Sequence, residues 1–260
     1  MSLLSRIIAR KTSKGGEPLV MSPHTVAAFD SELKALADMI GEMGSRAGNS
    51  LADATQALVE RDVQLAQQVI ASDRLIDNLQ QRIEEAAAST IGRRQPMAID
   101  LRDIISTMRI ANDLERIGDL GKNIAKRAVA VHSEQQPKQL MLGLKHMGEL
   151  ALGQVKEVLD AYIERDADRA LKVWYKDEEI DAMYNSLFRE LLTYMMEDPR
   201  NIGLCTHLLF GAKNIERIGD HATNIAETVY YLVHGSAITD QRPKGDTTSS
   251  TPVALKRSAG

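Results

Sequence analysis

Three kinds of feature are scarce in this sequence, and each scarcity excludes a class of protein. The single cysteine, Cys205, cannot form an internal disulfide and gives no zinc-ligand pattern, which fits a reducing compartment. Aromatic residues are only 4% of the chain and the net charge is −4, which argues against nucleic-acid binding. No apolar run approaches the roughly 18 to 20 residues that span a bilayer or forms a signal-peptide core. We therefore expect a cytoplasmic protein that binds no nucleic acid and has at most a peripheral contact with a membrane.

The residues that are abundant favour helix. The chain has 260 residues, 43% of them hydrophobic, and is rich in Ala, Leu, Ile, Met, Glu, Gln, Lys and Arg. We predict an all-α protein. Residues 1–23 are predicted to be a flexible basic extension. The alternative is a short helix on an anionic membrane, because MSLLSRIIARK mixes apolar and basic residues. Residues 239–260 are rich in Ser, Thr, Pro and Lys and are predicted to be a disordered tail.

The sequence between these ends repeats itself. Residues 111–125 and 212–226 are identical at nine of fifteen positions, including the whole of ERIGD, at a spacing of 101 residues. Residues 59–77 match residues 163–181 at a spacing of 104, and the apolar residues of segment 36–47 recur in segment 140–151 at the same spacing. All three segments carry apolar residues at helical spacing and are joined by short connections. We predict two tandem, pseudo-symmetric three-helix bundles with antiparallel helices, at residues 24–133 and 134–238.

Four pairs of acidic residues, each four residues apart, lie on packing faces of these helices. On a count of roughly 100° per residue, each pair continues a stripe of apolar residues toward the C-terminus of its helix. Like charges at this spacing repel, and facing pairs on neighbouring helices would gather four carboxylates in each bundle. The pairs are Asp73 with Asp77, Glu115 with Asp119, Asp177 with Asp181, and Glu216 with Asp220.

Three things can neutralise such carboxylates: protonation, pairing with Arg, or a bound cation. Arg116 and Arg217, three residues before Asp119 and Asp220, can pair with some of the acids but cannot reach them all. Carboxylates without Cys or His suit hard ions such as Mg²⁺, Mn²⁺ or iron, so we favour divalent or trivalent metal ions held by the eight acids. The alternative is an acidic network paired to Arg. Asn123 and Asn224 could add an amide oxygen or cap the sites.

The doubled ERIGD helices, RRQPMAIDLR, LLTYMMED and HTVAAFDSELKAL together resemble the PhoU family of bacterial phosphate-transport accessory proteins, over roughly residues 24–235. The resemblance implies two three-helix bundles with multinuclear metal sites on E(D)xxxD motifs, which are the same eight acids. It also implies a non-enzymatic cytoplasmic regulator, and we expect this chain to form a homodimer. Such a protein links the ATPase subunit of a phosphate ABC transporter to a sensor histidine kinase and keeps phosphate-starvation genes off.

Two other functions remain open from the residues. One is a di-iron carboxylate protein with redox or metal-storage activity, although such centres typically use ExxH pairs and this chain has none. The other is a structural helical protein whose acids are salt-bridged. No residue is predicted to be catalytic.

Overall fold

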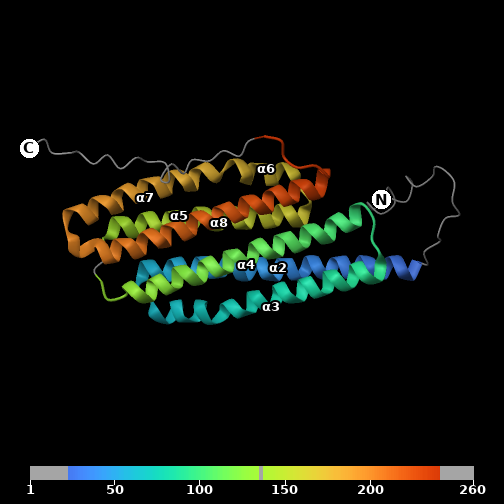
Figure 1. The fold of residues 1–260 in the computed structure, drawn as a ribbon, viewed down its shortest axis with the longest axis horizontal. Helices are drawn as coiled ribbons and strands as arrows, with labels where there is room; N and C mark the ends of the chain where they lie inside the picture. Colours follow the sequence, from blue (N-terminus) through green and yellow to red (C-terminus); the bar gives the residue numbers. More distant parts are fainter. Residues whose placement is uncertain (1–22, 135–136, 241–260) are drawn as a thin grey trace, which may run out of the picture.

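The computed structural model describes residues 23–134 and 137–240, and within them every regular element is helical (Figure 1). The prediction of an all-α fold with two three-helix repeats is confirmed. The predicted N-terminal extension and C-terminal tail lie outside the described residues, apart from Pro23 and residues 239–240. No helix among the described residues is both long enough and apolar enough to span a bilayer. The elements are α2 (Pro23–Glu60), α3 (Val63–Arg94), α4 (Ile99–Val131), α5 (Lys138–Glu164), α6 (Ala167–Tyr175), α7 (Asp177–Glu197), η1 (Pro199–Asn201) and α8 (Ile202–His234).

Helices α2, α3 and α4 form the first bundle, and equivalent turns join the helices of the second. Arg61 adopts a positive φ of 61° and Asp62 then caps α3, its carboxylate accepting a 2.9 Å hydrogen bond from the Leu65 amide. At the same place in the second repeat, Arg165 has a φ of 53° and Asp166 caps α6 by accepting from the Arg169 amide at 2.9 Å. Because a carboxylate at this position satisfies an otherwise free helix amide, each Arg-Asp pair ends one helix and begins the next.

The second bundle differs from the first in its middle helix, which is interrupted at Lys176 into α6 and α7. The Lys176 carbonyl accepts a hydrogen bond from the amide of Glu179, three residues later, where an α-helix would use the amide four residues later. It also accepts a 3.0 Å hydrogen bond from the side-chain amide of Gln154 on α5. A side chain that bonds into the backbone ladder is a known cause of helix breaks. In the first bundle, Ser50 of α2 stands at the position equivalent to Gln154, and α3 is not interrupted.

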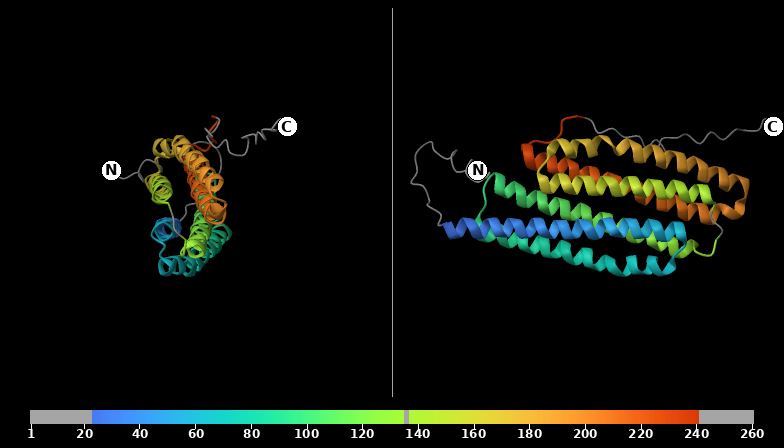
Figure 2. Two further views of the ribbon diagram at one scale, coloured as in Figure 1. Left: turned by 90° about the vertical axis from the view of Figure 1, so that its left-hand side faces the viewer. Right: turned by 180° about the vertical axis from the view of Figure 1, so that it is seen from behind.

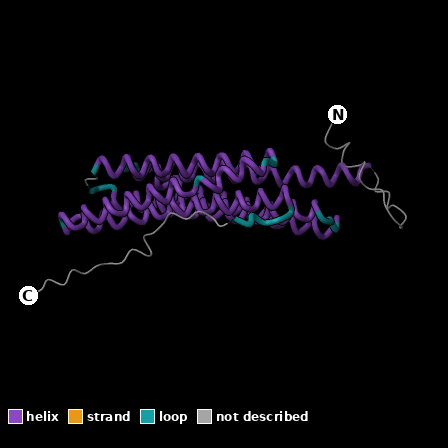
Figure 3. The backbone as a smooth tube through the Cα atoms, turned by 90° about the horizontal axis from the view of Figure 1, so that it is seen from above, coloured by secondary structure: helices purple, strands orange, loops and turns teal. Residues whose placement is uncertain are grey.

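The two bundles lie side by side, with their helices along one long axis (Figures 2 and 3). Helix α4 packs against α8, and α2 packs against α5. The contact between α2 and α5 is pseudo-symmetric: Gly44 faces Leu159, and Gly148 faces Thr55, one repeat length away. An added Cβ at Gly44 would lie 2.5 Å from Leu159 Cδ1, so glycine permits this close approach. Helix α4 packs against α2 and α3 of its own bundle and against α8 of the other bundle, so its buried residues surround the helix.

Candidate functional site

The four acids of the first repeat, Asp73, Asp77, Glu115 and Asp119, are brought together where α3 packs on α4, and we call them the first acidic cluster. The helices approach closely because Gly118 faces Ile76, whose Cδ1 would lie 2.7 Å from an added Cβ. Asp73 is only 5% exposed. Burial, followed by the charges of Asp73 and Asp119, raises the pKa of Asp77, while Lys122 opposes this. The acids therefore interact across the two helices, as the sequence predicts, but Asp77 is exposed and does not lie on the packing face where the sequence placed it.

A lysine that the sequence analysis did not consider lies in the first acidic cluster. The Lys122 ammonium donates to Asp73 Oδ2 on α3 and, at 2.6 Å, to Asp119 Oδ1 on its own helix. Burial alone would lower the pKa of Lys122, but the hydrogen bonds to Asp119 and Asp73 outweigh it and raise that pKa above its ordinary value. Lys122 thus remains charged and connects α3 to α4.

Glu115 occupies the other end of this cluster and is less well compensated. Arg116 Nε lies 3.4 Å from Glu115 Oε2, and Arg116 Nη1 lies 3.7 Å from Asp119 Oδ2, so the predicted arginine contacts occur. Neither is a good hydrogen bond, and Glu115 Oε2 has no hydrogen-bond partner among the described residues. Burial and then Asp119 raise the pKa of Glu115, while Arg116 lowers it.

The second acidic cluster, made by Asp177, Asp181, Glu216 and Asp220, repeats this arrangement between α7 and α8. Gly219 faces Ile180 as Gly118 faces Ile76, with 2.9 Å between an added Cβ and Ile180 Cδ1. Asp177, Asp181 and Glu216 are between 2% and 5% exposed, so this cluster is the more deeply buried. Burial raises the pKa of Glu216 to about 7; Lys213, 2.9 Å away, opposes the shift, and Asp220 and Asp181 add to it.

Two uncharged polar residues join the second acidic cluster. Thr223, at the repeat position of Lys122, donates to Asp177 Oδ1 at 3.3 Å and to the Gly219 carbonyl at 3.0 Å. Gln154 on α5 points its Oε1 toward Gly219, where that oxygen and Asp177 Oδ1 would each lie 3.6 Å from an added Cβ. Both Gln154 Oε1 and Glu216 Oε2 are buried and lack a hydrogen-bond partner in the described part of the chain.

These donors suit a metal ion in chemistry but are not arranged as a finished site. All are oxygen atoms, as Mg²⁺, Mn²⁺ and iron accept, and three of the buried oxygens have no hydrogen bond: Glu115 Oε2, Glu216 Oε2 and Gln154 Oε1. Nevertheless, across residues 23–134 and 137–240 no three His, Cys, Asp or Glu side chains converge closely enough to hold an ion. Binding therefore requires side chains of the clusters to rotate toward the ion.

The remaining predicted residues lie away from the clusters or on their edge. Asn224 donates to Asp113 Oδ1 at 3.3 Å, across the contact between α4 and α8, and does not extend the row of acids. Asn123 is half-buried and Arg217 is exposed. His221 Nδ1 lies 2.8 Å from the same Asp113 oxygen. A comparison of the two repeats position by position would have singled out Lys122 and Lys213, since neither lysine recurs in the other repeat.

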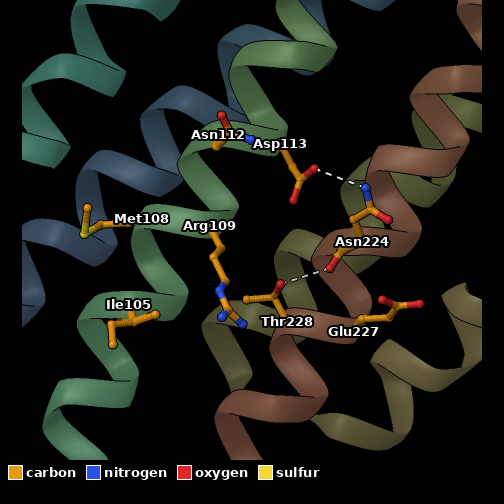
Figure 4. A pocket seen from close by; sticks show the side chains of 8 residues that line it. All are labelled: Ile105, Met108, Arg109, Asn112, Asp113, Asn224, Glu227 and Thr228. Atoms are coloured by element: carbon orange, nitrogen blue, oxygen red, sulfur yellow. Dashed lines mark hydrogen bonds between the residues drawn. The ribbon is translucent and has the colours of Figure 1, made fainter. Parts of the chain in front are cut away.

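An open cleft of about 550 Å³ lies beside this Asp113 contact (Figure 4). Arg109 and Asp113 of α4 face Asn224, Glu227 and Thr228 of α8 across it. Glu227 accepts a 3.0 Å hydrogen bond from the Trp174 indole, and the Arg109 guanidinium lies 5.5 Å from the centre of the Tyr231 ring. The cleft thus mixes one cation with two carboxylates and has no set of groups that points to one ligand class.

Known proteins match both repeats. The profile of the PhoU domain matches residues 40–128 and again residues 144–229. The chain belongs to the PhoU family. A "Phosphate-specific transport system accessory protein PhoU homolog" of Rhizobium meliloti (strain 1021) is 58% identical over 227 residues, which cover 87% of this chain and 96% of that protein. A PhoU homolog of the same description from Caulobacter vibrioides is 49% identical over 229 residues, covering 88% of this chain and all of that one.

Solved PhoU structures agree with the fold. The crystal structure of PhoU from Pseudomonas aeruginosa has a TM-score of 0.77 and 41% identity, and the match covers 80% of this chain and 100% of that one. The crystal structure of the phosphate transport system regulatory protein PhoU from Streptococcus pneumoniae has a TM-score of 0.75 and 31% identity, and the match covers 81% of this chain and 99% of that one. The match thus extends over both PhoU repeats and the acidic clusters that they contain.

Proposed function

We propose that this protein is a cytoplasmic negative regulator of the phosphate-starvation response. It acts without catalysis, as an adaptor between the ATPase subunit of a phosphate ABC transporter and a sensor histidine kinase, and it modulates phosphate uptake. The observation that carries the proposal is the match of both repeats to phosphate-transport accessory proteins of the PhoU family. A part in phosphate-transport regulation follows from that membership, and the adaptor role is the finer claim.

The distribution of exposed apolar residues supports an adaptor. Met97 and Ile99, in and after the turn from α3 to α4, are 80% and 67% exposed. Met196 and Ile202, around the turn from α7 to α8, are 78% and 49% exposed. These two turns lie at opposite ends of the molecule (Figure 1). One chain therefore offers two separate apolar surfaces, as simultaneous contact with two partners requires.

A reporter assay tests the regulatory role. A strain that lacks its own copy of this gene and carries a phosphate-starvation promoter fused to a reporter is grown with abundant phosphate. Expression of this chain is expected to restore repression, whereas an empty vector leaves the reporter on. A matched pair of variants, Met97→Glu with Ile99→Glu and Met196→Glu with Ile202→Glu, is expected to relieve repression at equal protein level. If the intact chain leaves the reporter on, the proposal is wrong.

The same proposal includes metal binding by the acidic clusters and a homodimer. A bound Mg²⁺, Mn²⁺ or iron ion would neutralise carboxylates that repel each other and connect neighbouring helices. The unbonded buried oxygens of Glu115 and Glu216 support this assignment. Metal analysis after purification without chelator tests the first part, and light scattering coupled to gel filtration, which gives the mass of the particle, tests the second.

A further inference from the structure

The contact between α4 and α8 carries different charges at two pseudo-symmetric positions. At one of them, Asp113 Oδ1 accepts a 3.3 Å hydrogen bond from Asn224 and lies 2.8 Å from His221 Nδ1. The repeat spacing of 101 residues makes Asn123 the counterpart of Asn224, and Asn214 the counterpart of Asp113. At the other position an uncharged amide therefore stands where the first has its carboxylate.

Arg127 brings a cation to the position where this carboxylate is replaced. It lies one helical turn beyond Asn123, on the same side of α4, and is partly buried. Its counterpart in the second repeat is the uncharged Thr228. The guanidinium lies 5.0 Å from the centre of the Phe210 ring, and its Nη1 lies 3.4 Å from His207 Nδ1. Both contacts are with α8, so Arg127 faces the other bundle.

Arg127 differs from the other partly buried basic side chains in what surrounds it. Within residues 23–134 and 137–240 no carboxylate forms an ion pair with it. Arg102 donates to the Leu232 carbonyl. The remaining partly buried cations all pair with carboxylates; they are Arg46, Arg94, Lys122, Arg169 and Lys213. Because a guanidinium is always protonated in proteins, Arg127 is a partly buried positive charge without an anion.

The edge of the guanidinium that fits an oxoanion is the one left free. Nη1 is directed at His207, which leaves Nε and Nη2, the parallel pair of donors that matches two oxygens of a carboxylate or phosphate. Nε is buried and has no hydrogen-bond partner among the described residues, so binding requires the side chain to turn this edge outward. Since arginine only donates, His207 Nδ1 accepts, and Nε2 of the neutral ring carries the proton as a further donor.

We propose that Arg127, Asn123 and His207 bind a small tetrahedral oxoanion, of the class of inorganic phosphate, between α4 and α8. Such an ion supplies the negative charge that Asp113 supplies at the pseudo-symmetric position. Its oxygens are enough for the guanidinium edge, the amide and the imidazole together, whereas a carboxylate has only two. The site uses no metal ion and none of the acids of the acidic clusters. Because its residues come from both bundles, the bound ion would strengthen the contact between them.

Titration with inorganic phosphate tests the inference. The full-length protein is treated with chelator, dialysed into metal-free buffer, and titrated by isothermal calorimetry with phosphate and, at matched ionic strength, with acetate. Phosphate is expected to bind more tightly than acetate. The variant Arg127→Gln is expected to weaken phosphate binding at least about tenfold, because charge-assisted hydrogen bonds are lost. The matched control is Arg46→Gln, whose arginine is already paired with Glu42 and which is expected to change nothing.

The ring of His207 reports where the ion binds. Its proton signals in the nuclear magnetic resonance spectrum are identified by their absence from the spectrum of His207→Gln. Phosphate is expected to shift them in the unchanged protein but not in Arg127→Gln. A melting curve followed by circular dichroism shows whether each variant is folded. Should Arg127→Gln fail to fold, the His207 shift in the unchanged protein and the phosphate affinity of Asn123→Ala, which is expected to be reduced, still decide the question.

Each outcome decides for or against this site. Phosphate binding that shifts the His207 signals and is weakened in Arg127→Gln supports the inference. Absence of phosphate binding at millimolar concentrations, or binding that leaves His207 unshifted or is unchanged in Arg127→Gln, overturns it. Acetate that binds as tightly as phosphate overturns the assignment to a tetrahedral ion. The proposed regulatory role is measured separately by the reporter assay and does not depend on these results.

Discussion

Replacement of Glu216 by Gln should stabilise the metal-free protein at alkaline pH but not at acid pH. In the folded chain the pKa of Glu216 is raised from 4.5 to about 7, chiefly by burial. Below pH 4.5 the folded and unfolded chains both carry the proton, so the substitution changes little there. Between pH 4.5 and 7 the unfolded chain loses its proton first, and the free energy of unfolding of the unchanged protein falls as the pH rises. Above pH 7 both forms are ionised and the penalty is constant.

The size of the effect follows from the same two values. Each pH unit between 4.5 and about 7 corresponds to about 1.4 kcal/mol, which gives a penalty of about 3 kcal/mol above pH 7. The pKa of about 7 already includes the opposing effect of Lys213, so the loss of this ion pair is not subtracted again. We therefore expect Glu216→Gln to raise the free energy of unfolding by about 3 kcal/mol at pH 8.

Urea unfolding in the presence of chelator, followed by circular dichroism and by Trp174 fluorescence at pH 4.5 and pH 8, measures this difference. The counterpart Glu115→Gln is the matched control. The Glu115 side chain is 15% exposed and that of Glu216 is 6% exposed, so burial costs Glu115 less and its gain at pH 8 should be smaller. A Glu216→Gln variant that is destabilised at pH 8, or stabilised equally at both pH values, would refute the reasoning that Glu216 is buried at a cost.

Three further changes test the packing. Gly41→Ala should stabilise the protein by roughly 0.5 to 1 kcal/mol, because an added Cβ there meets no atom within 4 Å and alanine is the better helix former. Gly121→Ala should instead cost about 1 to 3 kcal/mol, since its Cβ would lie 3.2 Å from the Ser50 backbone carbonyl carbon; equal melting temperatures for the two glycine variants would contradict the packing of α2 on α4. Asp113→Ala removes the acceptor of His221 and Asn224 between the bundles and should cost about 1 to 3 kcal/mol in urea unfolding, whereas an unchanged midpoint would show that this contact is not formed in solution.

The repeat and the apolar periodicity were sufficient to predict the two bundles. Residues 111–125 and 212–226 match at nine of fifteen positions, which predicts similar helices in the two repeats. The stripes that continue into Glu115, Asp119, Glu216 and Asp220 placed these acids on packing faces. The break at Lys176 could not be predicted, because it depends on a hydrogen bond from Gln154, which comes from another helix and is distant in sequence.

The same limit applies to the acidic clusters. That the acids gather follows from helical spacing, but what compensates them depends on side chains that reach across helices. Lys122 looks like an ordinary polar residue in the sequence, and only the packing of α3 on α4 places its ammonium on Asp73. His221 likewise meets Asp113 only because α8 lies against α4.

The adaptor role is tested most directly by a co-elution experiment with three purified components: this chain, the transporter ATPase subunit and the cytoplasmic part of the sensor kinase. We expect the ATPase subunit and the kinase to co-elute in gel filtration only when this chain is present, and to separate when Met97 with Ile99, or Met196 with Ile202, is changed to Glu. If neither partner binds the intact chain, or if the two bind each other equally well without it, the proposed adaptor role is contradicted.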